Sequence, residues 1–214
     1  MPCDAILFDL DGTLLDSLED LADAVNHALS LHGLPRRSLA EVRAFVGSGV
    51  RKLVERSAGF GPDDARYAPL FAAFQDYYAV HCGDATAPYP GIPELLAELK
   101  TRGFLLAVVS NKQDREVRAL VERHFPGMCS ATAGERPGIP RKPDPAPILN
   151  VIAELGTQRS RVIYVGDSDV DARTAANAGV PLAAVTWGYR SVEQLKEAGA
   201  ERFIDSPQQL LELL

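Results

Sequence analysis

The chain has 214 residues, 46% of them hydrophobic, and a formal net charge of −7 from 22 Lys+Arg against 29 Asp+Glu. This is enough apolar material for a buried core, and the basic residues form no long run that would attract nucleic acid or an anionic membrane. The three cysteines lie far apart, which argues against a disulfide framework or a zinc site, and no apolar stretch reaches the roughly 18 residues that span a bilayer. We therefore expect a cytoplasmic protein with neither nucleic acid nor membrane as a partner. Composition does not choose between a monomer and a homodimer, and both are kept as expectations.

The first predicted element is a buried strand that ends at a carboxylate. Residues 5–8, Ala-Ile-Leu-Phe, form an unbroken apolar run typical of a parallel strand covered on both faces, and Asp9 ends it. In open α/β sheets the carboxyl ends of the strands line the ligand crevice, so Asp9 and Asp11 are expected there. Gly12 allows a tight turn that exposes backbone amides to an anion. A polar turn that caps the strand is the structural alternative for an isolated Asp-x-Asp pair.

Residues 16–85 are predicted to be helical and to form a separate domain. Ser17 with Asp20, and Ser38 with Glu41, have the spacing of capping boxes. Aromatic residues at helical spacing in the last helix are interpreted as the core of a small bundle, since such stripes are far more often core than a binding box. The helices are expected over residues 18–32, from Ser38 to about 45, over 50–59, and from Pro62 to about 78.

A glycine-rich break separates the second and third of these helices. Gly47 and Gly49 flank Ser48, a pattern that suits a loop whose backbone amides close over a small ligand. Arg51 and Lys52 follow within one turn. The Arg51 guanidinium could hold a carboxylate through two hydrogen bonds, which makes this loop and Arg51 candidates for substrate specificity; a solvated basic face is the alternative.

Residues 85–92 are rich in proline and glycine, as is typical of a linker, and from Pro93 the pattern changes to alternating helices and strands. This alternation predicts an α/β fold, a Rossmann-like doubly wound parallel sheet. The core domain would comprise residues 1–15 and 86–214, and the helical domain, 16–85, would be inserted after the first strand as a cap. Strands are expected over 104–109, 129–133, 161–165 and 181–185, with helices over 94–102, from about 117 to 126, from Pro145, and over 171–178.

Two further segments could bind an anion at the same edge of the sheet. Ser110 and Asn111 follow the strand over 104–109 and could donate hydrogen bonds to a phosphate, although a helix N-cap is the ordinary interpretation of such a pair. Lys142 lies among prolines, which stiffen its loop and lower the entropic cost of directing its ammonium at a phosphate.

Three more carboxylates, Asp167, Asp169 and Asp171, follow the strand over 161–165. Gathered beside Asp9 and Asp11, so much negative charge requires a cation. Oxygen donors without a nearby Cys or His favour Mg²⁺ over Zn²⁺. An Asx-rich turn or helix cap is the structural alternative.

The string from Phe8 to Ser17, with Ser110, Lys142 and the segment 166–171, resembles the four motifs of the haloacid dehalogenase superfamily in order and spacing, over essentially the whole chain. The resemblance implies a Mg²⁺-dependent phosphatase that acts through an aspartyl-phosphate. It makes Asp9 the nucleophile and Asp11 the acid/base. It assigns phosphate binding to Ser110 and Lys142, and the loop residues Gly12 and Thr13 and the neighbouring Asn111 are expected to join them on the chemistry of their own groups. The metal site is expected to comprise Asp9, Asp11, Asp167 and Asp171, with either Asp169 or Asp171 in a supporting role.

Within the superfamily, residues 46–53, the segment Lys142-Pro-Asp-Pro and residues 185–189 resemble the bacterial phosphoglycolate phosphatases. The resemblance implies a small phosphorylated metabolite as the partner, with 2-phosphoglycolate first. Pyrophosphate or another small phosphate ester is the alternative substrate. A phosphomutase and a phosphate-binding protein without catalysis are the alternative functions.

Overall fold

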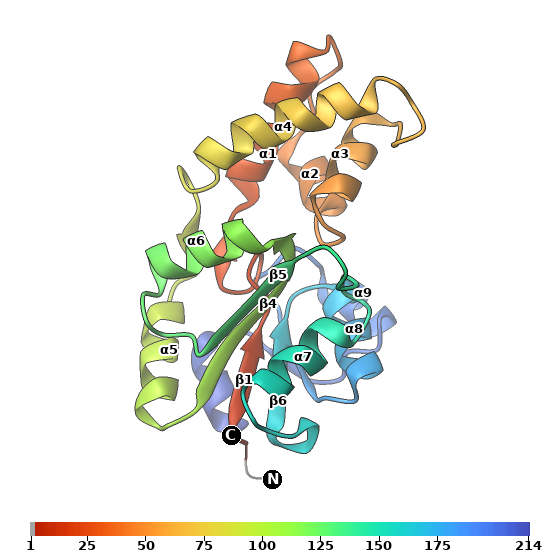
Figure 1. Cartoon of the computed structure of the whole chain (residues 1–214). Helices are drawn as coiled ribbons and strands as arrows, with labels where there is room; N and C mark the ends of the chain where they lie inside the picture. Colours follow the sequence, from red (N-terminus) through yellow and green to blue (C-terminus); the bar gives the residue numbers. More distant parts are fainter. Residues whose placement is uncertain (1–2) are drawn as a thin grey trace. The chain divides into compact units, whose positions relative to one another are not determined.

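In the computed structural model, which describes residues 3–214, the chain packs into two units (Figure 1). The α/β unit comprises the described residues up to Leu15 together with Pro88–Leu214, and the helical unit comprises Asp16–Ala87. The chain passes between the units through the short strands β2 (Leu15–Asp16) and β3 (Ala87–Pro88), which pair with each other.

A six-stranded parallel sheet with the order β5-β4-β1-β6-β7-β8 is the centre of the α/β unit. The central strand, β1, is completely covered because helices lie on both faces of the sheet. Its last residue, Phe8, pairs with Val108 of β4 and Val165 of β6, so Asp9 leaves the sheet beside both neighbours. The strands are β1 (Ala5–Phe8), β4 (Leu105–Gln113), β5 (Ala131–Glu135), β6 (Val162–Gly166), β7 (Leu182–Val185) and β8 (Phe203–Ile204).

The helices of this unit divide between the two faces according to the alternation of the strand side chains. Ile6 and Phe8 pack into a core with α5 (Ile92–Thr101), α6 (Asp114–His124) and the C-terminal 3₁₀ helix η2 (Pro207–Glu212). The other β1 side chains face α7 (Ala146–Glu154) and α8 (Asp169–Ala178). The doubly wound parallel sheet predicted from the sequence is therefore confirmed. A short 3₁₀ helix, η1 (Arg159–Arg161), precedes β6, and α9 (Val192–Glu197) packs beside α8.

The helical unit is built on the packing of α1 (Leu18–Leu31) against α4 (Tyr67–His81), with α2 (Leu39–Phe45) and α3 (Val50–Ala58) beside them. The aromatic stripe of α4 is core, as predicted: successive rings from Tyr67 to Tyr78 stack with centroids 5.8, 6.4 and 5.4 Å apart. Among residues 3–214, no helix has the length and apolar character that crossing a bilayer would require.

Two expectations about helix starts in this unit are wrong. The fourth helix begins at Tyr67 and not at Pro62, since the intervening residues form turns held by Asp64, which accepts hydrogen bonds from Arg66. The Ser17 side chain makes no capping hydrogen bond. Asp20 instead accepts from the backbone and hydroxyl of Thr86, which ties the start of α1 to the end of the helical unit.

The predicted end of β4, at residue 109, is also wrong. The strand continues to Gln113, because Gln113 pairs with Glu135 of β5 after a register shift. Ser110 and Asn111 therefore lie inside a strand and not after it. The short elements β2, β3, β8 and α9 were not predicted, since segments of two to six residues carry too little periodicity.

Candidate active site

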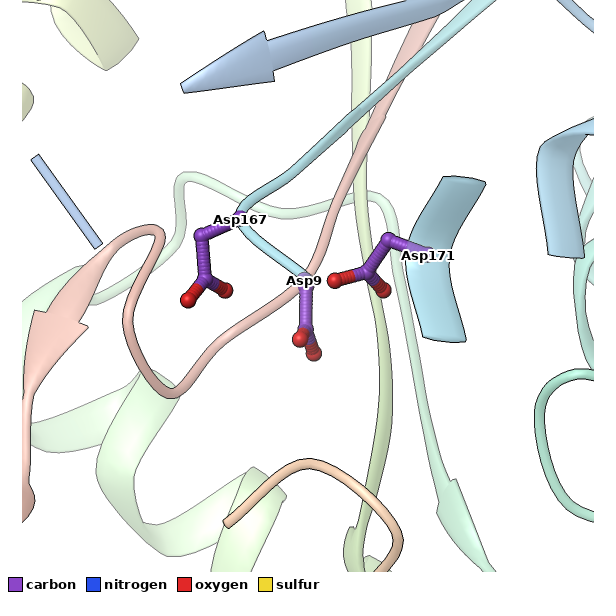
Figure 2. A group of neighbouring side chains, drawn as sticks. All are labelled: Asp9, Asp167 and Asp171. Atoms are coloured by element: carbon purple, nitrogen blue, oxygen red, sulfur yellow. The ribbon is translucent and has the colours of Figure 1, made fainter. Parts of the chain in front are cut away.

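Three buried carboxylates converge where β1 and β6 end (Figure 2). Asp9 directly follows β1, Asp167 directly follows β6, and Asp171 lies in the first turn of α8. Each offers one oxygen to a group whose oxygens all lie within 4.8 Å of one another. Figure 2 shows Asp9 between the other two. The parallel sheet therefore brings together residues that are about 160 positions apart in the sequence.

Lys142 supplies a buried positive charge to this group. Its Nζ lies 2.9 Å from Asp9 Oδ1 and 2.8 Å from Asp171 Oδ1, and it donates to the Tyr164 hydroxyl at 2.9 Å. Burial alone would lower the pKa of Lys142, but the carboxylates of Asp171 and Asp9 raise it above its usual value. Lys142 is thus a permanent cation that contacts two of the three carboxylates, those of Asp9 and Asp171.

The excess negative charge changes how the carboxylates titrate. Burial, followed by repulsion from Asp171, raises the pKa of Asp9 well above its ordinary value. The same two causes raise the pKa of Asp167 to about 7. For Asp171, burial is outweighed by Lys142, which lowers its pKa. Asp9 and Asp167 are therefore poorly compensated as anions until a further cation is present.

The donors fit a hard divalent cation such as Mg²⁺, because they are all carboxylate oxygens. The three residues are not equivalent. Both Asp171 oxygens accept two hydrogen bonds each, from Lys142 and Tyr164 on one and from the Ser168 amide and hydroxyl on the other. Because both Asp171 oxygens already accept hydrogen bonds from the protein, Asp9 and Asp167 are favoured as the direct metal ligands. Asp171 would then hold Lys142 and Ser168 in place beside them.

Asp169, the other carboxylate considered for the supporting role, lies outside this group. Its side chain is one-third exposed and pairs with Arg173 and with Arg190, whose Nε lies 3.3 Å from Asp169 Oδ1.

The loop after β1 packs directly against Asp167. Gly12 has φ +87°, and a Cβ built there would lie 2.4 Å from Asp167 Oδ2, so only glycine fits. Thr13 Oγ1 donates to Asp167 Oδ1 at 3.1 Å, and the Tyr189 amide donates to Asp167 Oδ2 at 2.8 Å. In this structure the Thr13 hydroxyl, predicted to contact phosphate, holds a carboxylate of the acidic group.

Asn111 and Ser110 lie beside the loop that carries Lys142. Asn111 Nδ2 donates to the Lys142 carbonyl at 3.0 Å, and the Lys142 amide donates to Asn111 Oδ1 at 2.9 Å. Asn111, predicted to bind phosphate, therefore positions the backbone of Lys142. Ser110 Oγ accepts from the Lys112 amide at 3.2 Å, and its hydroxyl hydrogen can still donate to an anion.

The Asp11 carboxylate does not join the acidic group and instead pairs with Lys112 of β4. Lys112 Nζ lies 3.0 Å from Asp11 Oδ1 and 3.2 Å from Asp11 Oδ2. Asp11 was predicted to be a metal ligand; its side chain offers no support for that role, which stays a prediction.

Lys112 was not predicted as a residue of the site, although the alternation of strand side chains indicates it. In an extended strand, residues i and i+2 point to the same face, so Lys112 follows Ser110 toward the site. Ending the predicted strand at Val109 hid this relation.

The predicted specificity residues lie in the helical unit. Residues 47–49 connect α2 to α3, and the first and last of them have φ +116° and +84°, values that favour glycine. The exposed Arg51 guanidinium lies 4.8 Å from the centre of the Phe71 ring, and the exposed Lys52 pairs with Glu55 at 2.8 Å. The role of this segment in substrate recognition stays a prediction.

Comparison with known proteins gives concordant matches. The family model of haloacid dehalogenase-like hydrolases matches residues 6–185. An N-acetylmuramic acid 6-phosphate phosphatase of Pseudomonas aeruginosa is 36% identical, over 98% of this chain and 94% of that protein. A phosphoglycolate phosphatase of Mesorhizobium japonicum is 38% identical, over 86% of this chain and 83% of that protein. A crystal structure from Lactobacillus delbrueckii, provisionally named a phosphoglycolate phosphatase, matches with a TM-score of 0.93 and 35% identity, over 100% of this chain and 98% of that one.

Proposed function

The chain belongs to the haloacid dehalogenase-like hydrolases and is a phosphoric monoester hydrolase, and we propose that it is a Mg²⁺-dependent phosphatase that acts through a phosphorylated Asp9. The observation that carries this proposal is the contact of the buried Lys142 ammonium with Asp9, at 2.9 Å, beside the further carboxylate of Asp167. A nucleophilic carboxylate can approach an anionic phosphoryl group only where cations offset their repulsion.

The proposed substrate is 2-phosphoglycolate or another small phosphate ester that carries a carboxylate. Two of the relatives are named for phosphate esters of acids, glycolate in one case and N-acetylmuramic acid in the other. Pyrophosphate and neutral phosphate esters are the alternatives, and the segment of residues 47–49 with Arg51 is the proposed source of the discrimination.

In the proposed mechanism, an Asp9 oxygen attacks phosphorus and the bond from phosphorus to the ester oxygen breaks. Asp11 gives its proton to the departing oxygen, so that the product leaves as an alcohol. A water molecule then attacks phosphorus, the bond to Asp9 breaks, and Asp11 takes the proton of the water. Asp9 and Asp11 are thereby returned to their starting states.

The other polar residues hold the reacting groups in place. Lys142 and the Ser110 hydroxyl would bind phosphate oxygens, Asn111 holds the Lys142 backbone, and Thr13 donates a hydrogen bond to Asp167. Asp9 and Asp167 would hold Mg²⁺, supported by Asp171, and Asp11 stays a candidate ligand. When bound, the ion supplies positive charge that offsets the negative charge of the phosphate and of the carboxylates.

The test is an assay of the purified protein on 2-phosphoglycolate, N-acetylmuramic acid 6-phosphate and pyrophosphate, with Mg²⁺ and with EDTA. We expect release of inorganic phosphate that EDTA abolishes and Mg²⁺ restores, with the highest kcat/KM on 2-phosphoglycolate. Full activity in EDTA would exclude the proposed role of the metal. If the ester is transferred within the substrate and not released, the protein is a mutase.

Borohydride reduction of the acid-quenched enzyme tests the intermediate, because it converts a phosphorylated aspartate into homoserine. Mass spectrometry should locate that change at Asp9. Its absence during turnover would contradict the covalent mechanism.

A further inference from the structure

Lys112 is a buried lysine to which the resemblance to the haloacid dehalogenase superfamily assigns no role. Its side chain is only 1% exposed, although lysine is rarely buried without a partner. The ammonium contacts both oxygens of Asp11, at 3.0 and 3.2 Å. Asp11 itself is 14% exposed, so the pair lies at the edge of the site and not deep in the core.

The backbone joins this ion pair to the phosphate-binding part of the site. The Lys112 amide donates to Ser110 Oγ at 3.2 Å, and the neighbouring Asn111 holds Lys142. The register shift of β4 occurs between Val109 and Gln113, in the same segment. One segment of β4 therefore supplies Ser110, a proposed phosphate ligand, holds the backbone of Lys142 through Asn111, and contacts Asp11 through Lys112.

We propose that Lys112 is a positioning residue that holds the Asp11 carboxyl in the orientation from which it delivers its proton to the leaving-group oxygen. The inference rests on the proposed function. An aspartate side chain has two rotatable bonds, and contacts from one ammonium to both oxygens restrict them. A displacement of about 1 Å in a proton donor can cost on the order of 100-fold in rate, so such restraint matters for catalysis.

The contact is compatible with both protonation states of Asp11. An ionised carboxylate accepts from Lys112 on both oxygens, as in this structure. A protonated carboxyl uses one oxygen to donate toward the ester and still accepts from Lys112 on the other. Because a lysine ammonium carries three donors, Lys112 can stay in contact while Asp11 changes from acid to base.

The nearest alternative is that Lys112 binds an anionic group of the substrate. Its charge lies beside Asp11, where the leaving group would emerge, and so it would be close to the carboxylate of 2-phosphoglycolate. The two roles predict different dependences on the substrate. Positioning of Asp11 matters for every ester with a poor leaving group, whereas carboxylate binding matters only for esters that carry a carboxylate.

The experiment compares wild type, Lys112→Met and Lys112→Arg on three esters. They are 2-phosphoglycolate, with a poor leaving group and a carboxylate; ethyl phosphate, with a poor leaving group and no carboxylate; and p-nitrophenyl phosphate, whose leaving group departs without a proton. The readout is kcat/KM, which reports steps up to departure of the leaving group and excludes hydrolysis of the phosphorylated enzyme. Lys100→Met, the same change at an exposed lysine of α5, is the control.

We expect Lys112→Met to lower kcat/KM by about 10- to 100-fold on both alkyl esters and by less than about 3-fold on p-nitrophenyl phosphate. Lys112→Arg should recover part of the loss, because it restores a cation with several donors, and Lys100→Met should behave as wild type. The ratio of kcat/KM between two esters does not depend on the folded fraction, so partial unfolding of a variant cannot imitate this result.

Three outcomes would overturn the inference. Equal losses on all three esters would make Lys112 merely structural, no loss on any would give it no role, and a loss confined to 2-phosphoglycolate would make it a carboxylate ligand. In each case wild-type activity leaves the proposed function intact. A wild-type protein without activity on any of the esters overturns the proposed function itself, and the inference with it.

Discussion

Two buried lysines offset part of the negative charge of the candidate active site. Lys142 contacts Asp9 and Asp171, and Lys112 contacts Asp11. Removing one partner of a buried ion pair leaves an uncompensated charge and typically costs about 3–5 kcal/mol. We therefore expect the free energy of unfolding to fall by about that amount when a lysine is replaced and its aspartate has no other cation nearby. The residues of the site are thus coupled electrostatically as well as by geometry.

Asp9→Asn should abolish turnover, with a loss of at least about 10³-fold in kcat, because an amide of the same shape is a poor nucleophile. The fold should be retained, since burial raises the pKa of Asp9 and a neutral amide removes a poorly compensated charge. Phosphate release and a thermal melt measure the two effects. Asp169→Asn, at a carboxylate outside the acidic group, is the control and should keep activity within about 3-fold. Near-normal activity of Asp9→Asn would refute the mechanism.

Asn111→Ala should destabilise the protein by about 1–3 kcal/mol and lower its activity, because it leaves the buried amide and carbonyl of Lys142 without their side-chain partner. Urea unfolding and the KM for phosphate esters measure the effects. Asn177 provides a matched control, since it donates to the carbonyl of Pro143 in the same loop from an exposed position. Asn177→Ala should cost less than about 0.5 kcal/mol. Equal effects of the two variants would contradict the positioning role of Asn111.

At the scale of the elements, the segments that follow β1, β6 and β7 meet at Asp167 with almost no free space. Gly12 approaches it from the segment after β1, and Gly188 approaches it from the segment after β7. A Cβ built on Gly188 would lie 2.2 Å from the Cβ of Asp167. The close approach of backbone to carboxylate is therefore part of how the sheet positions Asp167.

Gly188→Ala should destabilise the fold by about 1–3 kcal/mol, because the added methyl group must displace Asp167. It should also reduce activity, although it adds only one methyl group, because Asp167 is a proposed metal ligand. Chemical unfolding and Mg²⁺ titration of activity measure the two effects. Gly61→Ala is the control: a Cβ there meets the flexible Glu55 side chain at 3.2 Å, and the helical unit carries none of the acidic group. If Gly188→Ala keeps wild-type stability and metal dependence, the packing argument is wrong.

At the scale of the whole molecule, the acidic group couples stability to metal and pH. The pKa of Asp167 is about 7 in the folded protein against 3.8 in a model compound, because of burial and the charge of Asp171. The folded state thus holds this proton more tightly than the unfolded chain. The resulting destabilisation is complete above pH 7 and disappears as the pH falls through 7 toward 4.

Without metal, the charge of Asp167 should make the protein less stable at pH 8 than at pH 6. Mg²⁺ should stabilise the protein more at pH 8, where the ion does not compete with protons for the Asp167 carboxylate. Melting temperatures in EDTA and in Mg²⁺ at both pH values measure this effect. Asp167→Asn should weaken the pH dependence of the Mg²⁺ effect, and Asp9, whose pKa burial also raises, should retain the remainder. A Mg²⁺ shift that is larger at pH 6 would contradict the assignment of Asp167 as a ligand.

The helical unit is predicted to contribute specificity through Arg51. Arg51→Ala should lower kcat/KM on 2-phosphoglycolate by about 10-fold or more and leave p-nitrophenyl phosphate nearly unchanged, since only the former offers a carboxylate to a guanidinium. Lys52→Ala is compared in parallel, because Lys52 already pairs with Glu55. If Arg51→Ala affects the two substrates equally, or affects neither, carboxylate recognition by this residue is wrong.

The amino-acid sequence by itself determined the parallel sheet, apart from β8 and the end of β4, and the places of Asp9 and Asp167 at the ends of two of its strands. The strand of residues 5–8 is continuously apolar and stops at Asp9, and β6 is likewise apolar and stops before Asp167. Patterns of neighbouring residues were therefore sufficient to locate these two carboxylates. The family resemblance then added the expected role of Asp9 as nucleophile, which stays a prediction.

Only the tertiary structure decided which polar groups contact one another. Lys112 reaches Asp11 across 101 positions of sequence, and Thr13 reaches Asp167 across 154. These contacts depend on strand order and on the register of β4, which shifts after Val109, and a pattern of neighbouring residues carries no information about either. Lys112 was therefore missed as the partner of Asp11, although the alternation of side chains along an extended strand does indicate that it shares a face with Ser110.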